Sequence, residues 1–558
     1  MKPLGLAKGP PSVALFSWPA ATRLGARAAA YLPVLVPAVF LLVMLLAPAL
    51  RLMLQGMAPG WFGAPVDLEA SGGLAWVTSL FAPWQDAYLR GRMAWSLTQA
   101  ALTCMICLLV GLPLAWVLAR FEFAGRTLVL RLLMLPFVVP TLVAALGVLA
   151  LMGPRGLLVQ LGGPDLQGTP WLLLYGNVFF NLCVLVRAAT ESLGQVSAAR
   201  LAAARSLGCT PWRAFWRVEL PAIAPWLMSA LCLVFLYCFS GFGLALVLGG
   251  QDYGTVEVEI YTLVAHELQL GSASVLALWV MAFTGLVAWT YAAVERRLAT
   301  PLRADTVPRQ SPRTPLQWAA VIGCVAVLAL VCAAPLVAIV WRAAHAGAQV
   351  WAVLSDEATL QALWNTCRFS ASALAVATVL GVLHAVAARR SLWLRTAVFL
   401  PFVVSPVMVG FGLLLLYPSW TNSAGLLVAA YALLAYPFVA KAVASALDGL
   451  PASYADAARS LGANPWRAFW RVSLPLIAPA LRRGMAFAAA TAVGEFAVSL
   501  FLSRPEWATL TTLIYQHLGR PGAANMDAAL VLACVLMLLS FAAFMLIEWP
   551  SREERRDA

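Results

Sequence analysis

The sequence predicts an all-α integral membrane protein of about twelve transmembrane helices, arranged as two parallel halves of six helices each. The chain of 558 residues is 62% hydrophobic and only 11% charged, and its mean hydropathy is +0.85. Soluble domains carry about a quarter charged residues, so this chain must expose most of its surface to lipid. Apolar runs of bilayer length recur along the chain, and one polar loop occurs twice almost unchanged.

Twelve apolar runs are long enough to cross a bilayer, for which about 20 residues are needed. In the first half they cover residues 31–54, 95–118, 130–152, 171–187, 222–248 and 275–294. In the second half they cover residues 318–341, 362–386, 396–417, 425–443, 477–502 and 528–547. The first run follows about thirty residues of mixed composition, unlike the short charged region of a secretory signal, so we expect it to remain uncleaved.

The charged residues are distributed unevenly between the two sides of the predicted bundle. Segments on one side carry Lys2, Lys8, Arg23, Arg27, Arg120, Arg126, Arg131, Arg296, Arg297, Arg303, Arg309, Arg313, Arg389, Arg390 and Arg395. Segments on the other side carry Asp67, Glu69, Asp86, Asp252, Glu257, Glu259 and Glu267. By the positive-inside rule, both termini and the central linker are cytoplasmic. The net charge of +13 is therefore a topology signal, and we expect no nucleic-acid partner.

One segment occurs twice at a constant offset of 254 residues, from 203 to 457. Residues 203–225 read AARSLGCTPWRAFWRVELPAIAP, and residues 457–479 read AARSLGANPWRAFWRVSLPLIAP. Further equivalent positions are Phe242 and Phe496, Tyr261 and Tyr515, and the string LPFVV at 135–139 and 400–404. Six predicted spans separate the two loops, so both loops face the cytoplasm and the halves are parallel repeats.

These observations divide the chain into five parts. They are a cytoplasmic N-terminal segment (1–30), a first half (31–294), a cytoplasmic linker (295–317), a second half (318–548) and a cytoplasmic tail (549–558). The repeated cores cover residues 94–294 and 361–548, and the repeated loops cover residues 202–221 and 456–475.

The repeated loop has the form of two short helices joined at a glycine. In the first copy, residues 202–207 favour a helix, Gly208 interrupts it, and the proline that follows suits the first turn of a second helix. The second helix places Trp212, Phe215 and Trp216 on one stripe. Such a stripe fits a groove on another protein, whereas the alternative is that it anchors the loop at the lipid interface. Two near-identical copies at equivalent positions favour docking.

The loops resemble the cytoplasmic signature of the permeases of ATP-binding-cassette (ABC) importers, in which Glu-Ala-Ala, three residues, Gly, nine residues and Ile-x-Leu-Pro follow one another. The second loop matches it with Asp456-Ala457-Ala458, Gly462 and Val472-x-Leu474-Pro475. The first loop matches it with Ala202-Ala203-Ala204, Gly208 and Val218-x-Leu220-Pro221, but lacks the opening acid. The resemblance implies the type I importer fold and a location in a bacterial inner membrane. We expect Asp456 to favour a helix N-terminus or a basic residue on the partner, and the loops therefore to dock unequally.

The resemblance also implies the partners of this chain. In the family each loop is a coupling helix that enters a cleft on an ATPase subunit. We therefore expect two ABC-type ATPase subunits, which use ATP and Mg, and a periplasmic substrate-binding protein, with lipid around the chain and no cofactor in it. The coupling residues implied in the first loop are Ala202, Ala203, Ala204, Gly208, Trp212, Arg213, Phe215, Trp216, Leu220 and Pro221. Those in the second loop are Asp456, Ala457, Ala458, Gly462, Trp466, Arg467, Phe469, Trp470, Leu474 and Pro475.

Within the family, two fused halves of this length are similar to the thiamine and iron(III) uptake permeases. Three strings are more similar to the thiamine permeases: WQDAY at 84–88, VFFN at 178–181 and IYQ at 514–516. The resemblance implies import of thiamine or its phosphate esters from periplasm to cytoplasm by alternating access, with iron(III) as the alternative. An ion-coupled secondary transporter also uses repeats, but it needs no paired docking loops.

The chain itself is not expected to be an enzyme. A P-loop needs Lys after Gly, whereas Lys2, Lys8 and Lys441 follow Met or Ala, so ATP hydrolysis requires a separate subunit. Nearly all ten cysteines fall inside predicted spans, and Cys104 and Cys107 lie on an apolar helix without the strand that a redox motif needs. The four histidines share no ligand spacing, so we expect neither a metal nor a catalytic site.

Three polar residues inside predicted spans are candidates for the substrate pathway. Glu495 lies in the eleventh span, and its counterpart in the first half is Gly241. Ionisable residues in spans usually face a cavity or a partner, so Glu495 is a candidate way-station for a cationic substrate. The alternative is that Glu495 bonds to backbone groups near a helix end. Asn177 and Asn181 share one helix face in the fourth span, where bonding between helices is the role we expect.

Overall fold

The computed structural model describes residues 33–57, 75–297, 307–389, 392–398, 400–502 and 504–548. In these ranges the chain is helical, with one isolated bridge between Phe121 and Gln310. Eleven of the described helices are long and apolar enough to cross a membrane, and a shorter apolar helix at Pro406–Leu416 occupies the site of the remaining predicted span. The N-terminal segment, the C-terminal tail and residues 298–306 of the linker lie outside the described residues.

The first half contains one entry span, Pro33–Met57, and a repeated core. The entry span ends with α2 (Ala47–Met57), and the short helix α3 (Ala75–Gln85) lies between it and the core. The core consists of α4 (Ala87–Arg120), α5 (Arg126–Leu132), α6 (Leu135–Val138), α7 (Thr141–Met152), α9 (Pro170–Gly194), α10 (Ala198–Ser206), α11 (Pro211–Ala214), α12 (Leu220–Phe239), α13 (Gly243–Leu248), α14 (Val256–Ala265) and α15 (Leu270–Arg297).

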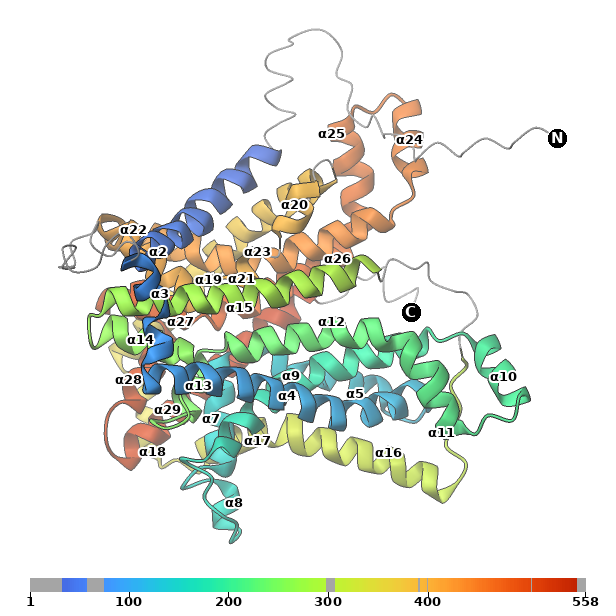
Figure 1. Ribbon diagram of the computed structural model, residues 1–558, viewed down its shortest axis with the longest axis horizontal. Helices are drawn as coiled ribbons and strands as arrows, with labels where there is room; N and C mark the ends of the chain where they lie inside the picture. Colours follow the sequence, from blue (N-terminus) through green and yellow to red (C-terminus); the bar gives the residue numbers. More distant parts are fainter. Residues whose placement is uncertain are drawn as a thin grey trace.

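The second half repeats this order element by element, which confirms the predicted repeat. Its entry helices are α16 (Pro315–Leu328) and α17 (Ala334–Ala344). Its core consists of α19 (Glu357–Ala388), α20 (Leu392–Ala397), α21 (Leu400–Val403), α22 (Pro406–Leu416), α23 (Ala424–Gly449), α24 (Ala452–Ser460), α25 (Pro465–Ala468), α26 (Leu474–Val493), α27 (Ala497–Leu502), α28 (Leu510–Leu518) and α29 (Ala523–Glu548). The loop helices α10, α11, α24 and α25 lie at one end of the molecule, and α14 and α28 lie at the other (Figure 1). The halves are therefore parallel.

The entry helix of each half packs against the opposite half. Helix α2 contacts α15 of its own half and α22 of the second, and α17 contacts α29 of its own half and α7 of the first (Figure 1). Two equivalent glycines permit this approach. A Cβ on Gly147 would lie 2.9 Å from the carbonyl oxygen of Pro335, and one on Gly412 would lie 3.0 Å from Cβ of Pro48. Small residues of this kind allow membrane helices to approach closely.

Two equivalent hydrogen bonds also join the halves. The hydroxyl of Thr284 in α15 donates to the carbonyl oxygen of Val403 at 2.7 Å. The hydroxyl of Ser540 in α29 donates to the carbonyl oxygen of Val138 at 2.8 Å. Each bond connects the last span of one half to the short α6 or α21 helix of the other, so the two halves form one crossed assembly.

Candidate functional site

Both repeated loops form the helix, glycine turn and second helix that the sequence predicted. Gly208 and Gly462 adopt φ angles of +76° and +84° between the two helices of each loop. This left-handed conformation strongly favours glycine and ends the first helix. The side chains of Thr210 and Asn464 then accept hydrogen bonds from the backbone at the start of α11 and α25, at 3.4 and 2.7 Å.

The second helix of each loop continues into the membrane, whereas the sequence suggested a short hairpin followed by a separate span. A π-helical turn at Phe215–Glu219 joins α11 to α12, and another at Phe469–Ser473 joins α25 to α26. The two spans therefore begin inside the loops rather than near residues 222 and 477. Because the helix is continuous, we expect a displacement of either loop to be transmitted directly to the span that follows it.

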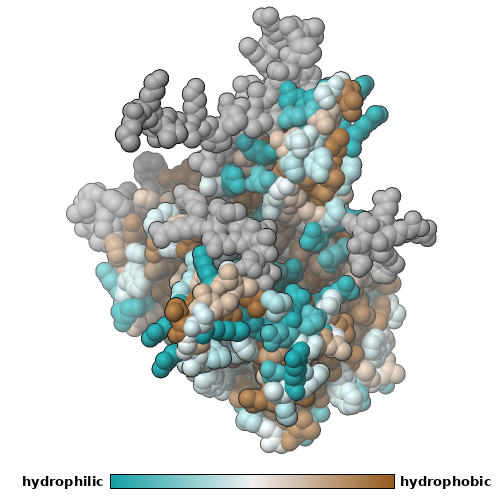
Figure 2. Space-filling model, turned by 90° about the vertical axis from the view of Figure 1, so that its right-hand side faces the viewer, coloured by the Kyte–Doolittle hydropathy of each residue, from teal (hydrophilic) through white to brown (hydrophobic). Residues whose placement is uncertain are grey.

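The two loops expose apolar surface on the same face of the molecule. Figure 2 views this face, on which hydrophilic side chains surround hydrophobic patches. The indole rings of Trp212, Trp216, Trp466 and Trp470 are 70%, 49%, 64% and 50% exposed. Arg213, Arg467, Pro221, Pro475, Ala202, Ala203, Asp456 and Ala457 are also exposed, Ala204, Phe215, Phe469, Leu220 and Leu474 are partly buried, and Ala458 is buried. Exposed apolar patches with a polar surround are typical of protein interaction sites.

A buried ion pair attaches the first loop to the membrane core. Glu219, at the end of the π-helical turn, lies 2.8 Å from the guanidinium of Arg120 at the end of α4, and their side chains are 6% and 11% exposed. The counterpart of Glu219 in the second loop is Ser473, which cannot form such a pair. The sequence analysis missed this pair because the two residues are far apart in the chain.

The acid of the second loop has a different position from the one expected. Helix α24 begins at Ala452, so Asp456 lies in its second turn and not at its N-terminus. The field of the helix ends acts mainly in the first and last turns, so it stabilises this carboxylate little. Asp456 is 3.5 Å from Arg459 on the same helix, and its side chain is 63% exposed. Its acceptor oxygens therefore face outward, where a partner could reach them.

Two spans are broken near the middle of the molecule. The sequence predicted continuous helices over residues 222–248 and 477–502, but Gly241 lies in a break between α12 and α13 and Glu495 in a break between α26 and α27. Breaks of this kind expose backbone groups, and they are tolerated at membrane depth where they line a cavity. In transporters built from repeats, discontinuous helices commonly form the substrate site.

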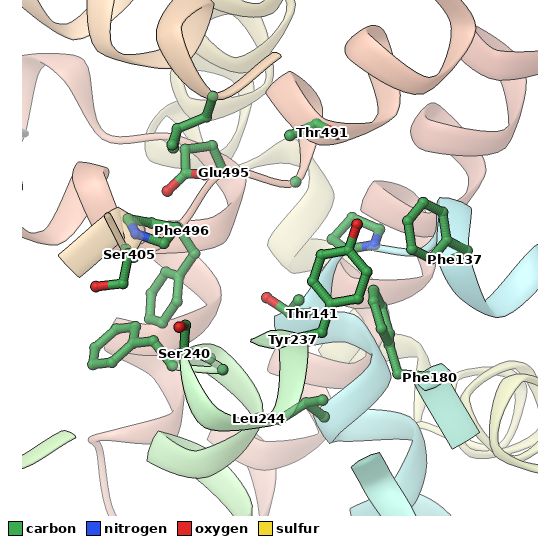
Figure 3. A pocket seen from close by; sticks show the side chains of 18 of the residues that line it. Phe137, Thr141, Phe180, Tyr237, Ser240, Leu244, Ser405, Thr491, Glu495 and Phe496 are labelled. Atoms are coloured by element: carbon green, nitrogen blue, oxygen red, sulfur yellow. The ribbon is translucent and has the colours of Figure 1, made fainter. Parts of the chain in front are cut away.

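A cavity of about 250 Å³ lies between the two breaks and is bounded by both halves. Figure 3 shows Glu495 and Ser405 on one side of it and Phe137, Phe180 and Tyr237 on the other. None of the described residues that line the cavity is Lys, Arg or His. The lining of the cavity is mostly apolar, includes six aromatic side chains and contains one carboxylate.

Glu495 bonds to a backbone group near a helix end and also faces a cavity, so its position is compatible with both hypotheses of the sequence analysis. Its Oε1 accepts a hydrogen bond from the backbone N–H of Val498 at 3.0 Å, which caps α27. The residue is only 8% exposed and lines the cavity. The carboxylate is thus held by the backbone while it faces the space between the halves.

The two asparagines take different positions. Asn177 donates to the side-chain oxygen of Gln99 at 2.7 Å and so joins α9 to α4, but it does not line the cavity. Asn181 donates to the carbonyl oxygen of Asn177 at 3.0 Å and lines the cavity. Its side-chain oxygen is buried and has no hydrogen-bond partner among the described residues.

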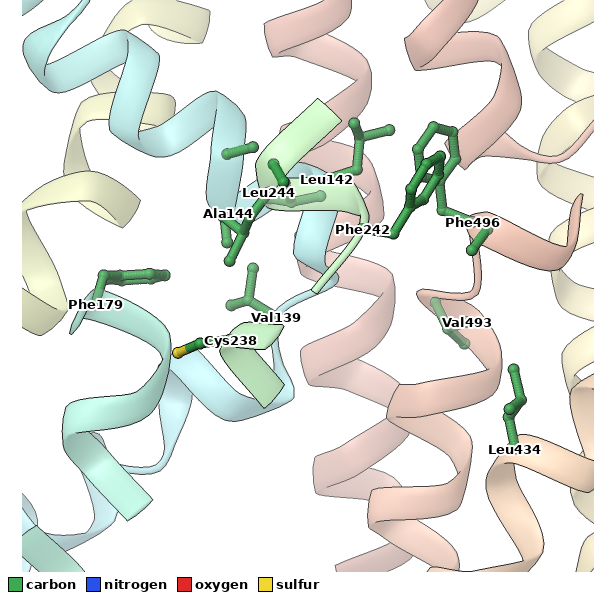
Figure 4. Packing of buried hydrophobic residues seen from close by; sticks show 14 of the residues in the cluster. Val139, Leu142, Ala144, Phe179, Cys238, Phe242, Leu244, Leu434, Val493 and Phe496 are labelled. Atoms are coloured by element: carbon green, nitrogen blue, oxygen red, sulfur yellow. The ribbon is translucent and has the colours of Figure 1, made fainter. Parts of the chain in front are cut away.

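An aromatic cluster borders the cavity and connects it to α14 and α28, at the end of the molecule away from the loops (Figure 1). The rings of Phe242 and Phe496 stack at 5.9 Å across the two halves, and Figure 4 shows them side by side. Tyr261 packs edge-on against Phe242 at 5.4 Å, and Tyr515 packs in the same way against Phe496 at 5.3 Å. The sequence analysis assigned these residues no function, although their equivalent positions in the repeat were a usable signal. We call these four residues the aromatic seal.

A second buried acid joins the halves next to the seal. The hydroxyl of Ser405, which also caps α22, donates to Oε2 of Glu257 at 2.9 Å. The sequence analysis placed Glu257 among the acidic residues of the outer side, but it is fully buried. Its other oxygen has no hydrogen-bond partner among the described residues. The sequence shows neither the burial of Glu257 nor its partner. The repeat gives no signal either, because the second half has Thr511 at the equivalent position.

The described residues contain no group of three or more His, Cys, Asp or Glu side chains placed to hold a metal ion. The ten cysteines are all free.

The parallel halves, crossed entry helices, paired loops and central cavity define a membrane permease of the ABC importer class. The chain belongs to the family described as the binding-protein-dependent transport system inner membrane component, which matches residues 111–300 and 377–553. It is a multi-pass protein of the inner membrane, and the two matches correspond to its two halves.

Known transport proteins are similar to this chain, some along most of its length and others along part of it. The thiamine transport system permease protein ThiP of Escherichia coli is 28% identical, covering 89% of this chain and 94% of that protein. The protein of the same name from Haemophilus influenzae is 25% identical, over 86% and 91% of the two chains. The molybdenum transport system permease protein ModB of Haemophilus influenzae is 30% identical over 28% of this chain and 76% of its own. A solved bacterial ABC transporter involved in alginate import aligns with 50% of this chain and 98% of its own, at 17% identity and a TM-score of 0.41.

Proposed function

We propose that this chain forms the membrane pathway of an ATP-driven importer that moves thiamine or a phosphate ester of it from periplasm to cytoplasm. One observation carries the proposal: two exposed copies of the same loop lie at one end of the molecule, each continuous with a helix that ends at the central cavity. The similarity to thiamine permeases over nearly the whole chain supports this cargo.

The proposed cycle follows from this connection. Two ATPase subunits bind the loops on the cytoplasmic side, which is the side we expect for the basic segments. When ATP closes the ATPase dimer, the subunits displace both loops, and the continuous helices rock the halves apart at the aromatic seal. A periplasmic binding protein then delivers the cargo to the opened side, and ATP hydrolysis returns the halves to the arrangement described above.

Iron(III) remains the alternative cargo within the same class of importer. Hard ferric iron prefers oxygen and nitrogen ligands gathered around one point. The lining of the central cavity is mostly apolar and partly aromatic, with Glu495 as its only charged side chain among the described residues. This composition favours an organic cation over a bare metal ion as the cargo.

Uptake in cells that lack their own thiamine transport tests the cargo. Cells that express this chain with its ATPase and binding protein should accumulate labelled thiamine, whereas cells with a hydrolysis-deficient ATPase should not. The purified chain alone should hydrolyse no ATP, since it carries no P-loop. Uptake of iron(III) without thiamine would refute the cargo, and ATP turnover by the isolated chain would refute its dependence on a separate ATPase.

A further inference from the structure

We infer that the central cavity is itself a binding site for a flat heteroaromatic cation. The permease, and not the binding protein alone, would then recognise the cargo. The inference rests on the proposed function, because thiamine joins a cationic thiazolium ring to an aminopyrimidine ring. It adds a recognition step inside the membrane, with named residues from both halves.

The charge of the cavity selects a cation. Glu495 is the one charged side chain among the described residues that line it, and the backbone N–H of Val498 occupies one of its oxygens. Removing a carboxylate from water is costly unless an opposite charge or hydrogen bonds replace the water. An entering cation would supply that charge and stabilise the ionised carboxylate. An anionic ligand would find no basic partner there.

The wall opposite Glu495 suits a flat ring. Phe137 lies at the centre of this wall, with its ring 5.7 Å from that of Phe180 and 5.9 Å from that of Tyr237. Figure 3 shows these three side chains together, across the cavity from Glu495. Aromatic faces attract both flat rings and cations, and the attraction increases when the cation is desolvated.

Two buried polar atoms at the cavity lack partners within the protein. The side-chain oxygen of Asn181 and the hydroxyl of Ser240 are both buried without a hydrogen bond among the described residues, and both residues line the cavity. Buried polar atoms are nearly always paired, so an unpaired atom indicates a missing partner. The oxygen of Asn181 can accept a hydrogen bond from a ring amino group, and Ser240 can donate one to a ring nitrogen.

The site is asymmetric within a symmetric frame. Gly241 occupies the position equivalent to Glu495, so the carboxylate comes from the second half, whereas Asn181 and Ser240 come from the first. A ligand with its charge at one end and its hydrogen-bonding group at the other would therefore lie in one orientation across the interface. The volume of about 250 Å³ is just below the roughly 300 Å³ of small ligand pockets and suits a molecule of this size.

Direct binding to the permease and ATPase complex in lipid nanodiscs, without the binding protein, tests the inference. Two probes are compared: labelled thiamine, and its uncharged isostere in which a thiophene replaces the thiazolium ring. Glu495→Gln removes the charge but keeps an oxygen that can accept from Val498, so α27 remains capped. This variant should lower thiamine affinity by about tenfold or more and change affinity for the neutral isostere little.

Two further variants complete the test. Glu191→Gln makes the same substitution in an exposed ion pair with Arg187 and should leave the binding of both probes unchanged. Phe137→Leu removes an aromatic face and should lower the affinity for both probes to a similar extent. This variant keeps the inference testable if the Glu495→Gln complex does not assemble.

The binding data judge the site separately from the cargo. Absence of measurable thiamine binding to the wild-type complex, in a system that still imports thiamine, would overturn the inference and leave the proposed function intact. An equal loss of affinity for thiamine and for the neutral isostere in the Glu495→Gln variant would also overturn the inference. Thiamine binding without thiamine uptake would instead refute the proposed function.

Discussion

Four acidic residues in the loops, at the contact between the halves and at the cavity have no acidic counterpart in the other half. Glu219 and Glu257 in the first half correspond to Ser473 and Thr511, and Asp456 and Glu495 in the second correspond to Ala202 and Gly241. Glu219 and Asp456 lie in the repeated loops, Glu257 at the contact between the halves and Glu495 at the cavity. The backbones of the two halves are related by the repeat, but these acidic residues make the charges of the two halves different. A cargo without twofold symmetry fits such an asymmetric pathway.

Asp456→Ala should weaken binding of the ATPase to the permease. Its carboxylate is exposed and has only a 3.5 Å contact with Arg459, so it is available to a basic residue of the partner. Loss of one charge-assisted hydrogen bond would lower affinity by roughly tenfold. The measurement is ATPase affinity in nanodiscs, with Ala202→Asp as the matched variant, for which we expect a smaller change. Equal affinity of wild type and Asp456→Ala would remove the proposed inequality of the loops.

Glu219→Ser, which copies the second loop into the first, should destabilise the protein and loosen coupling. It leaves the guanidinium of Arg120 buried without its 2.8 Å partner. Removing one member of a buried pair costs about 3 to 5 kcal/mol. Thermal denaturation should begin at a lower temperature, and fewer substrate molecules should be transported per ATP.

Two controls identify the cause of that effect. Ser473→Ala changes the equivalent position without breaking a pair and should behave as wild type. The double variant Arg120→Met with Glu219→Leu removes both charges and should recover most of the stability. Normal stability and coupling in Glu219→Ser would show that the pair has no mechanical role.

At the level of elements, the glycine turn ends the first helix of each loop, and the π-helical turn joins the second helix to a membrane span. A side chain at Gly462 would meet no atom within 4 Å, so the requirement for glycine comes from its φ of +84° and not from lack of space.

Gly462→Leu should therefore reduce transport, whereas Gly462→Asn should retain most of it. Asparagine tolerates the left-handed conformation better than leucine, for which it costs roughly 1 to 2 kcal/mol. Transport rates at equal amounts of protein in the membrane provide the comparison. If the two variants lost activity equally, the backbone conformation would not be the decisive property.

For the whole molecule, the crossed entry helices keep the halves together while the aromatic seal sets which side is closed. The seal stacks Phe242 on Phe496, and it lies on the side away from the loops. The two halves are thus in contact there. Any opening towards the binding protein must separate this pair, so the contact contributes to the free energy difference between the two states.

Phe242→Ala combined with Phe496→Ala should shift the population towards the state that is open on the binding-protein side. ATP hydrolysis by the assembled complex should then rise without the binding protein, because less energy is needed to reach the state that the binding protein normally favours. Phe235→Ala, which removes a ring stacked on Phe239 within one half, is the control and should leave this basal rate unchanged. An unchanged basal rate in the double variant would show that the seal does not hold the closed state.

The amino-acid sequence alone was enough to predict the membrane class, the two parallel halves and the helix–glycine–helix form of the loops. These follow from local properties: apolar runs of bilayer length, a repeated string, and a glycine and a proline at fixed spacing. It also singled out Glu495, since a carboxylate in an apolar run is costly wherever the helix lies.

Three features depend on how the chain packs in three dimensions: which helices cross between the halves, where the spans break and which groups surround each acid. An apolar run has the same composition whether its helix is continuous or broken. The sequence therefore did not predict the breaks at Gly241 and Glu495, which the folded structure shows. Likewise, Glu219 with Arg120 and Glu257 with Ser405 are pairs of residues distant in the chain. Their partners depend on packing between helices, which hydrophobic periodicity does not encode because lipid and neighbouring helices are equally apolar.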